Sequence, residues 1–183
     1  MLEFNFTPFP VIETERLLLR RITNDDVNEV FELRSNPETM KYIPRPLLKN
    51  TENALEHIAM IEDKIETNVG INWGITLKDN PKLLGIIGFY RLQPEHHRAE
   101  IGYMLLPEFH GKGIIPEALK TLIDYGFNKM KLHSIEAVID PDNYASERVL
   151  QKLNFVKEGH FKEVEYFEGH FYDSVIYSLL ESK

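Results

Sequence analysis

The sequence runs Leu105-Leu106-Pro107-Glu108-Phe109-His110-Gly111-Lys112-Gly113-Ile114-Ile115-Pro116 at its most informative point. An apolar run ends, a turn containing two glycines follows, and Pro116 stands where the first turn of a helix is expected. A helix N-terminus carries unpaired N–H groups and about half a positive charge, so such a turn suits a phosphate group. Gly111 and Gly113 lack a Cβ, which lets the backbone approach a bulky polyanion, and Lys112 adds a positive charge. The stretch therefore predicts an anion-binding loop.

Three other interpretations of this loop are open. The glycines can serve only to reverse the chain, as in an ordinary structural turn. A nucleotide phosphate loop fits poorly, because it needs Ser or Thr directly after the lysine and neither follows Lys112. A dinucleotide-binding fingerprint is closer, since Gly111 and Gly113 match its first two glycines and Asp140 ends the next expected strand. However, Pro116 replaces its third glycine, and hairpin-like strands precede the loop.

Working outward, apolar spacing predicts the other elements. Before the loop we expect strands at residues 16–22, 71–78, 83–92 and 99–106, with helices at 27–35 and 51–68. After it we expect a helix from Pro116, a strand at 133–139, a helix after Asn143, and strands at 155–167 and 171–180. This order predicts an α/β protein with a mixed sheet. No repeat or linker suggests a domain boundary, so residues 1–183 are expected to form a single domain.

Composition narrows the class of protein. The chain has 183 residues, 43% of them hydrophobic, and no cysteine, which excludes disulfides, Cys-bound zinc and a thiol nucleophile. Its net charge of -8 argues against nucleic-acid binding, which relies on Lys and Arg neutralising phosphates. No apolar run is long enough for a membrane span, and the N-terminus lacks the pattern of a secretory signal. We therefore expect a soluble, cytoplasmic protein without membrane or nucleic-acid partners.

A second polar stretch, Asp140-Pro141-Asp142-Asn143-Tyr144-Ala145-Ser146, lies between an expected strand and an expected helix. Asn143 or Asp142 can cap that helix, which is a purely structural role. Alternatively, these side chains bind a ligand, because open α/β sheets bind ligands at the carboxyl ends of their strands. Asn154 is expected to end the helix in the left-handed conformation.

Together the two stretches resemble the GNAT superfamily of acyl-CoA-dependent N-acetyltransferases, and most closely its RimJ/RimL-type branch. His110-Gly111-Lys112-Gly113 is similar to the family's pyrophosphate loop, although His110 replaces the usual Gln or Arg and Ile115 the usual Gly or Ala. The loop's main-chain donors survive both changes. The common tyrosine acid of other branches falls at Leu150, which cannot do this job. Four further segments resemble the branch in the same order: residues 14–20, 99–105, 143–146 and 153–155.

The resemblance implies a mixed, mostly antiparallel central sheet of about seven strands flanked by about four helices. It also implies a splayed central cleft, where the strand at 99–106 separates from the strand beginning near His133. Acetyl-CoA would be the co-substrate, with no metal required. The residues expected to bind it are Met104, Leu105, Leu106, His110, Gly111, Lys112, Gly113, Ile114, Ile115, Asn143 and Ser146.

Two residues are candidates for catalysis. Strand alternation places Glu100 and Gly102 on one face, and we expect the glycine to leave room for a substrate beside this carboxylate, the candidate base. The alternative is that Glu100 is a buried structural acid paired with Arg98 or with a nearby backbone group. By the resemblance, Ser146 is the candidate acid toward the CoA thiolate, directly or through water. Its alternative role is that of a helix-cap hydroxyl.

The resulting functional hypothesis is transfer of acetyl from acetyl-CoA to a primary amine. The acceptor would be a protein N-terminal α-amine, such as that of a ribosomal protein, or a small molecule such as a polyamine or aminoglycoside. A hypothesis of a different class is an acyl-CoA-binding sensor or interaction module of the same fold that has lost catalysis. The family is also compatible with a homodimer.

Overall fold

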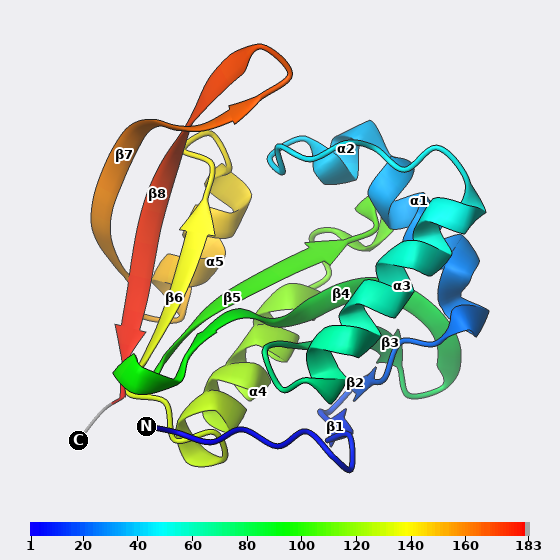
Figure 1. Cartoon of the computed structure of the whole chain (residues 1–183), viewed down its shortest axis with the longest axis horizontal. Coiled ribbons are helices and arrows are strands. Elements are labelled where there is room, and N and C mark those ends of the chain that lie inside the picture. Colours follow the sequence, from blue (N-terminus) through cyan, green and yellow to red (C-terminus); the bar gives the residue numbers. More distant parts are fainter. Residues whose placement is uncertain (182–183) are drawn as a thin grey trace.

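The computed structural model describes residues 1–181 and contains five helices and eight strands within them (Figure 1). The helices are α1 (Val27–Ser35), α2 (Pro37–Met40), α3 (Thr51–Glu66), α4 (Ile114–Asn128) and α5 (Tyr144–Lys152). The strands are β1 (Ile12–Glu13), β2 (Leu17–Arg20), β3 (Ile71–Leu77), β4 (Asn80–Gln93), β5 (Arg98–Leu105), β6 (Ser134–Ile139), β7 (Val156–Phe167) and β8 (His170–Leu180). The expected order is confirmed, and the two-residue β1 and the one-turn α2 are additions to it.

All eight strands form one sheet in the order β1-β2-β3-β4-β5-β6-β8-β7. Every neighbouring pair is antiparallel except β5 and β6, so the sheet is mixed and mostly antiparallel, as expected. The parallel pair is short, because only Arg98–Glu100 of β5 align with Ser134–Glu136 of β6. Beyond Glu100 the two strands diverge (Figure 1), which confirms the splay in the middle of the sheet.

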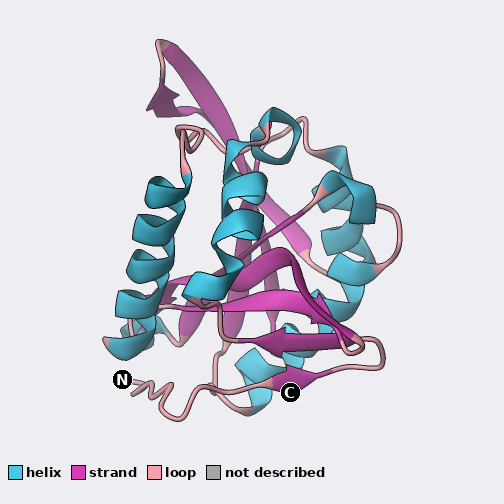
Figure 2. Cartoon of the chain, turned by 90° about the vertical axis from the view of Figure 1, so that its right-hand side faces the viewer, coloured by secondary structure: helices cyan, strands magenta, loops and turns pink. Residues whose placement is uncertain are grey.

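Helices cover both faces of the sheet (Figure 2). On one face, Tyr125 of α4 packs edge-on against Trp73 of β3, with ring centroids 5.5 Å apart, and Gly126 lets Phe89 of β4 approach. Ile101 of β5 is paired with Phe89 and shares that face. Because strand residues alternate, Glu100 lies on the opposite face, which α1 and α3 cover.

Local sequence explains where helices begin and end. The Asn36 side chain accepts hydrogen bonds from the amides of Glu38 and Thr39, and Pro37 fits the first helical position, so α2 begins where α1 ends. Asn154 follows α5 in the left-handed conformation at φ 65°, as predicted. No helix in the described part of the chain is long and apolar enough to cross a membrane.

Candidate active site

The loop between β5 and α4 has the features expected of an anion-binding site. Gly111 and Gly113 adopt left-handed φ angles of 72° and 74°. Gly113 is the N-cap of α4 and no side chain caps this end, so the first amides of the helix have no side-chain partner. A Cβ added to Gly111 would meet no atom within 4 Å. The loop therefore presents main-chain donors and open space to a pyrophosphate.

The loop is held in place by the segment before β2. Glu117 in the first turn of α4 accepts hydrogen bonds from the Thr14 hydroxyl at 2.6 Å and from the Arg16 amide at 3.0 Å. The Arg16 guanidinium binds the same carboxylate at 2.7 Å and donates to the Lys112 carbonyl at 3.0 Å. These bonds lower the pKa of Glu117 against the effect of its burial. The sequence analysis did not assign this role to Thr14 or Arg16, which lie about 100 residues before the loop.

The end of β5 has main-chain groups facing the splay. The Leu106 amide donates to the Leu84 carbonyl of β4 at 2.9 Å, so this N–H is not free for a ligand. Alternate residues face the other side, so Tyr103 and Leu105 direct their main-chain groups toward the gap. The His110 ring contacts the Leu105 carbonyl through Nε2 at 2.9 Å. The Leu105 N–H therefore remains as the group best placed for an extended ligand.

The polar stretch after β6 caps helix α5 and also contributes the Ser146 hydroxyl to the site. The Asn143 side chain caps α5 by accepting a hydrogen bond from the Ser146 amide at 3.1 Å. The Ser146 hydroxyl lies near the hydroxyl of Tyr103 on β5, although no regular hydrogen bond joins them. Burial raises the pKa of Tyr103, and the nearby Ser146 hydroxyl opposes this rise. Tyr103 is thus a candidate proton donor that the sequence analysis missed.

The two hydroxyls allow a specific prediction. Tyr103→Phe is expected to lower kcat about 10-fold if the pair relays a proton to the leaving thiolate. The protein should not lose stability, because the buried Tyr103 hydroxyl has no hydrogen-bond partner in residues 1–181. Ser146→Ala is expected to have a similar effect, and the double variant should be no slower than either single variant. Thiol-release kinetics with thermal melts would check this, and losses that multiply would contradict a relay.

Few protein groups contact the carboxylate of Glu100, the residue that the sequence predicts as a candidate base. Its carboxylate accepts no hydrogen bond within the described chain, and its nearest cation is Arg91 at 3.6 Å, whose side chain is 70% exposed. The structural alternative from the sequence named the wrong partner, because Arg98 pairs with Glu136 of β6. Burial raises the pKa of Glu100, Arg91 lowers it, and Glu136 and Glu165 raise it further.

The space beside Glu100 differs from our expectation. We expected Gly102 to leave room for a substrate, but the Tyr90 ring from β4 lies over it: a Cβ added to Gly102 would be 2.9 Å from Tyr90 Cε2. A register shift between Phe89 and Arg91 in β4 places Tyr90 there, and no single-sequence pattern signals such a bulge. Burial of its hydroxyl among protein groups raises the pKa of Tyr90 to about 12, so Tyr90 stays protonated.

Two further titratable side chains, Arg34 and His57, belong to the same region as Tyr90. Arg34, in the last turn of α1, has its pKa lowered by burial and by nearby Arg45. His57 of α3 has its pKa lowered to about 4 by burial and by the positive charges of Arg34 and Lys64. His57 is therefore neutral at physiological pH.

The depressed pKa of His57 predicts acid sensitivity. Between about pH 6.5 and pH 4 the unfolded chain protonates His57 while the folded chain does not, so the free energy of unfolding falls as the pH is lowered. The loss is up to about 3 kcal/mol, and His57→Gln should remove it. Urea unfolding at pH 7 and pH 4.5 would measure this, with exposed His133→Gln as control. Equal pH dependence in wild type and His57→Gln would contradict the assignment.

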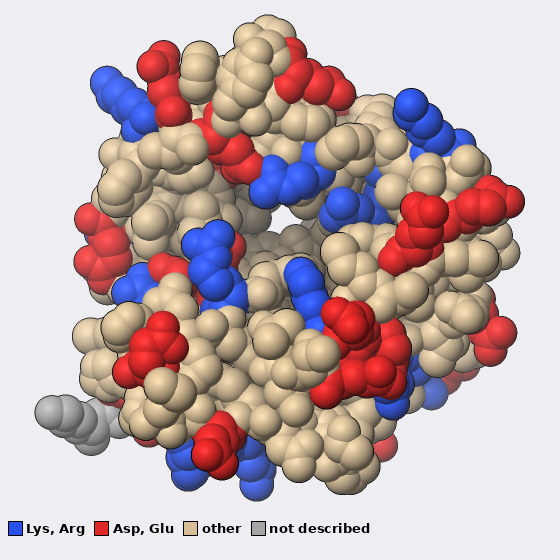
Figure 3. Space-filling model, in the orientation of Figure 1, with Lys and Arg blue, Asp and Glu red and all other residues tan. Residues whose placement is uncertain are grey.

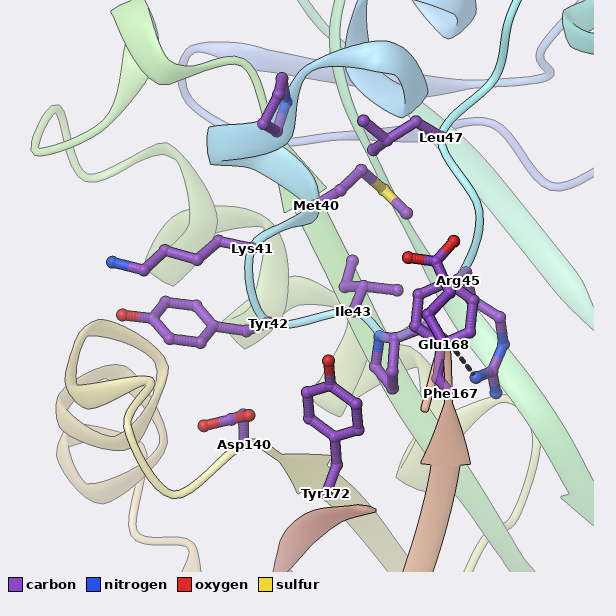
Figure 4. A pocket seen from close by; sticks show the side chains of 12 residues that line it. Met40, Lys41, Tyr42, Ile43, Arg45, Leu47, Asp140, Phe167, Glu168 and Tyr172 are labelled. Atoms are coloured by element: carbon purple, nitrogen blue, oxygen red, sulfur yellow. Dashed lines mark hydrogen bonds between the residues drawn. The ribbon is translucent and has the colours of Figure 1, made fainter. Parts of the chain in front are cut away.

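An opening lies where β5 and β6 separate, between them and α2, and Lys and Arg side chains border it (Figure 3). Beside it is a pocket of about 200 Å³ between the loop after α2 and the tip of the β7–β8 hairpin. Tyr42, Asp140 and Tyr172 line one side of it, each from a different element (Figure 4). Arg45 joins the α2 loop to Glu165 of β7 through an ion pair.

Comparisons with known proteins agree with this arrangement. The family model described as Acetyltransferase (GNAT) domain matches residues 16–156. The uncharacterized N-acetyltransferase YoaA of Bacillus subtilis is 38% identical over 175 residues, covering 96% of this chain and 99% of YoaA. The crystal structure of a GNAT-family acetyltransferase from Bacillus anthracis superimposes with a TM-score of 0.83 at 31% identity, covering 93% of this chain and 98% of that one. RimL, a ribosomal L7/L12 α-N-protein acetyltransferase in complex with coenzyme A, has a TM-score of 0.84 at 22% identity, covering 93% and 98% of the two chains.

The chain therefore belongs to the GNAT family of acetyltransferases. It is an N-acetyltransferase, which confirms the family that the sequence resembled, and it shares its fold with RimL.

Proposed function

We propose that the protein transfers acetyl from acetyl-CoA to a primary amine. The proposal rests mainly on the loop that contains Gly111 and Gly113. This loop offers uncapped amides and open space, and it follows β5, the strand that also carries Glu100. The donor's pyrophosphate would bind the main chain of residues 111–115, and its pantetheine arm would follow β5 along the splay. A fold shared with RimL, whose complex contains coenzyme A, supports a donor of this class.

The transfer is a direct displacement. Glu100 takes a proton from the acceptor ammonium, directly or through water, and the freed nitrogen lone pair attacks the thioester carbonyl carbon. The C–N bond forms, the attacking nitrogen loses its second proton to water, and the tetrahedral intermediate collapses with cleavage of the C–S bond. The thiolate of CoA then takes a proton from the Tyr103 and Ser146 hydroxyls, which are reprotonated from solvent. The acceptor and acetyl-CoA would enter the splay from opposite sides and meet there, which brings the amine and the thioester close enough to react.

The acceptor would enter from the side of the pocket between the α2 loop and the hairpin tip. This side carries Glu100 and Tyr90, while the hydroxyls of Tyr103 and Ser146 lie on the other side of β5. A base on the amine side and proton donors on the thiol side match the two proton transfers of the reaction.

A calorimetric titration with acetyl-CoA, with NADH as the control ligand, tests the proposal first. We expect micromolar binding of acetyl-CoA alone, followed by thiol release when amines are screened. Binding of NADH alone would overturn the assignment of the loop. Binding of acetyl-CoA with no turnover on any amine would instead favour the sensor or interaction module.

A further inference from the structure

On the face of the sheet where the acceptor is proposed to bind, one of three arginines has no carboxylate partner among the described residues. Arg45 is paired with Glu165, and Arg91 with Glu100. Arg34 has no carboxylate partner among residues 1–181, and its Nε is buried without a hydrogen-bond acceptor. Arg34 as a whole is half-buried, and a guanidinium with an unsatisfied buried N–H and no carboxylate partner among the described residues can bind an anion.

The surroundings of Arg34 do not supply that anion. Tyr90 is adjacent but stays protonated, and His57 is neutral. Arg45 lies close enough to lower the pKa of Arg34, although its own charge is paired with Glu165, and Lys64 lies close enough to His57 to lower the pKa of that imidazole. Within the described residues, neither Arg34 nor Lys64 forms an ion pair with a carboxylate.

Tyr90 connects this cation to the candidate base. Its hydroxyl is influenced by both Arg34 and Glu100, and its ring covers Gly102, two residues along β5 from Glu100. A ligand lying along the Tyr90 ring would thus have one end near the carboxylate and the other near the guanidinium. The first end suits an ammonium group and the second suits a carboxylate or phosphate, which the planar fork of Arg binds with two hydrogen bonds.

We propose that the acceptor is an amine that also carries an anionic group, a carboxylate or a phosphate ester, and that Arg34 binds this group. The inference deepens the proposed function and rests on it. It disfavours linear polyamines, because these would place positive charge beside an uncompensated guanidinium.

The inference can be tested with pairs of amines in which one member carries an anionic group and the other lacks it. Suitable pairs are phosphoethanolamine and ethanolamine, serine and serinamide, and peptide amides beginning Ser-Asp and Ser-Asn, with spermidine as the cationic comparison. We expect the anionic member of at least one pair to have a kcat/KM roughly 10- to 100-fold higher, as for a hydrogen-bonded charge. The pair with the largest difference in kcat/KM shows whether the anionic group is a phosphate or a carboxylate. It also shows whether the acceptor is a free amino acid or a peptide.

Variants of Arg34 show whether this residue causes the preference. Arg34→Gln should abolish it by raising KM for the anionic member, with the affinity for acetyl-CoA and the rate on the neutral member unchanged. Arg34→Lys keeps the charge and should restore part of the preference if the first variant is poorly folded. Lys129→Gln, which removes an exposed charge at the end of α4, is the matched control.

A binding measurement separates this inference from the proposed function. Phosphoethanolamine and serine are titrated into the protein saturated with CoA, for wild type and Arg34→Gln. Binding that requires Arg34 would support the anion site even if no amine is acetylated, a result that would contradict only the proposed function. Equal rates within every pair, a preference for spermidine, or absence of Arg34-dependent binding would overturn the inference.

Discussion

Glu100→Gln is expected to lower kcat by about 100-fold or more, the contribution typical of a general base. The amide has nearly the same shape as the carboxylate but cannot accept the ammonium proton. Stability should change little, because Glu100 loses only a weak ion pair with the exposed Arg91. The affinity for acetyl-CoA should be unchanged, since the donor is expected to bind the loop at Gly111 and Gly113. Thiol-release kinetics and calorimetry on the same samples would measure both quantities.

The pH profile distinguishes a base from a structural acid. Glu100 must be deprotonated to act, so kcat/KM should fall as the pH drops through its pKa, which burial raises above the usual range. Arg91→Gln removes the charge that lowers this pKa, so the acidic limb should move to higher pH. Glu32→Gln, an exposed change on α1, is the control and should alter neither rate nor profile. An acidic limb that persists unchanged in Glu100→Gln would contradict the assignment.

Gly111→Ala is expected to weaken acetyl-CoA binding by roughly 10- to 100-fold, the effect of losing a charge-assisted hydrogen bond. The added Cβ meets no protein atom within 4 Å, so it would project into the space that we assign to the pyrophosphate. The φ of 72° also costs about 1 kcal/mol with any side chain. At saturating acetyl-CoA the rate should recover, because the reacting groups are distant from this glycine.

Gly169→Ala is a closely matched control for this prediction. Gly169, at the tip of the β7–β8 hairpin, has a φ of 86° and equally open surroundings, so alanine there carries a similar strain. The two variants should lose similar stability in urea unfolding, and only Gly111→Ala should lose affinity for acetyl-CoA in calorimetry. Equal affinities in both variants would show that Gly111 serves only to turn the chain, which is the structural interpretation of the loop.

The order of elements could be predicted from the sequence because it depends on local patterns. In α3, Ala54, Ile58, Ile61 and Ile65 recur at helical spacing and are all buried. The segment β3–β4 is divided by turn residues, and Pro116 and the two glycines mark the start of α4. The one-turn α2 and the two-residue β1 were not predicted, because they are too short to show a period. The bulge that places Tyr90 over Gly102 depends on how β4 pairs with β5, which no local pattern encodes.

The family, the order of the helices and strands, and the glycine-containing turn to which we assign anion binding could all be recognised from the sequence, because they follow from residues that are neighbours along the chain. The pairing of charged side chains, by contrast, is known only from the folded chain. The tertiary structure joined Arg98 to Glu136 rather than to Glu100, anchored the loop through Arg16 and Glu117, and left Arg34 without a partner in the described residues. Charged side chains interact over a few ångströms in space whatever their separation in sequence, so their pairing depends on strand register and helix packing. The identity of the acceptor therefore depends on contacts that the chain forms only once it is folded.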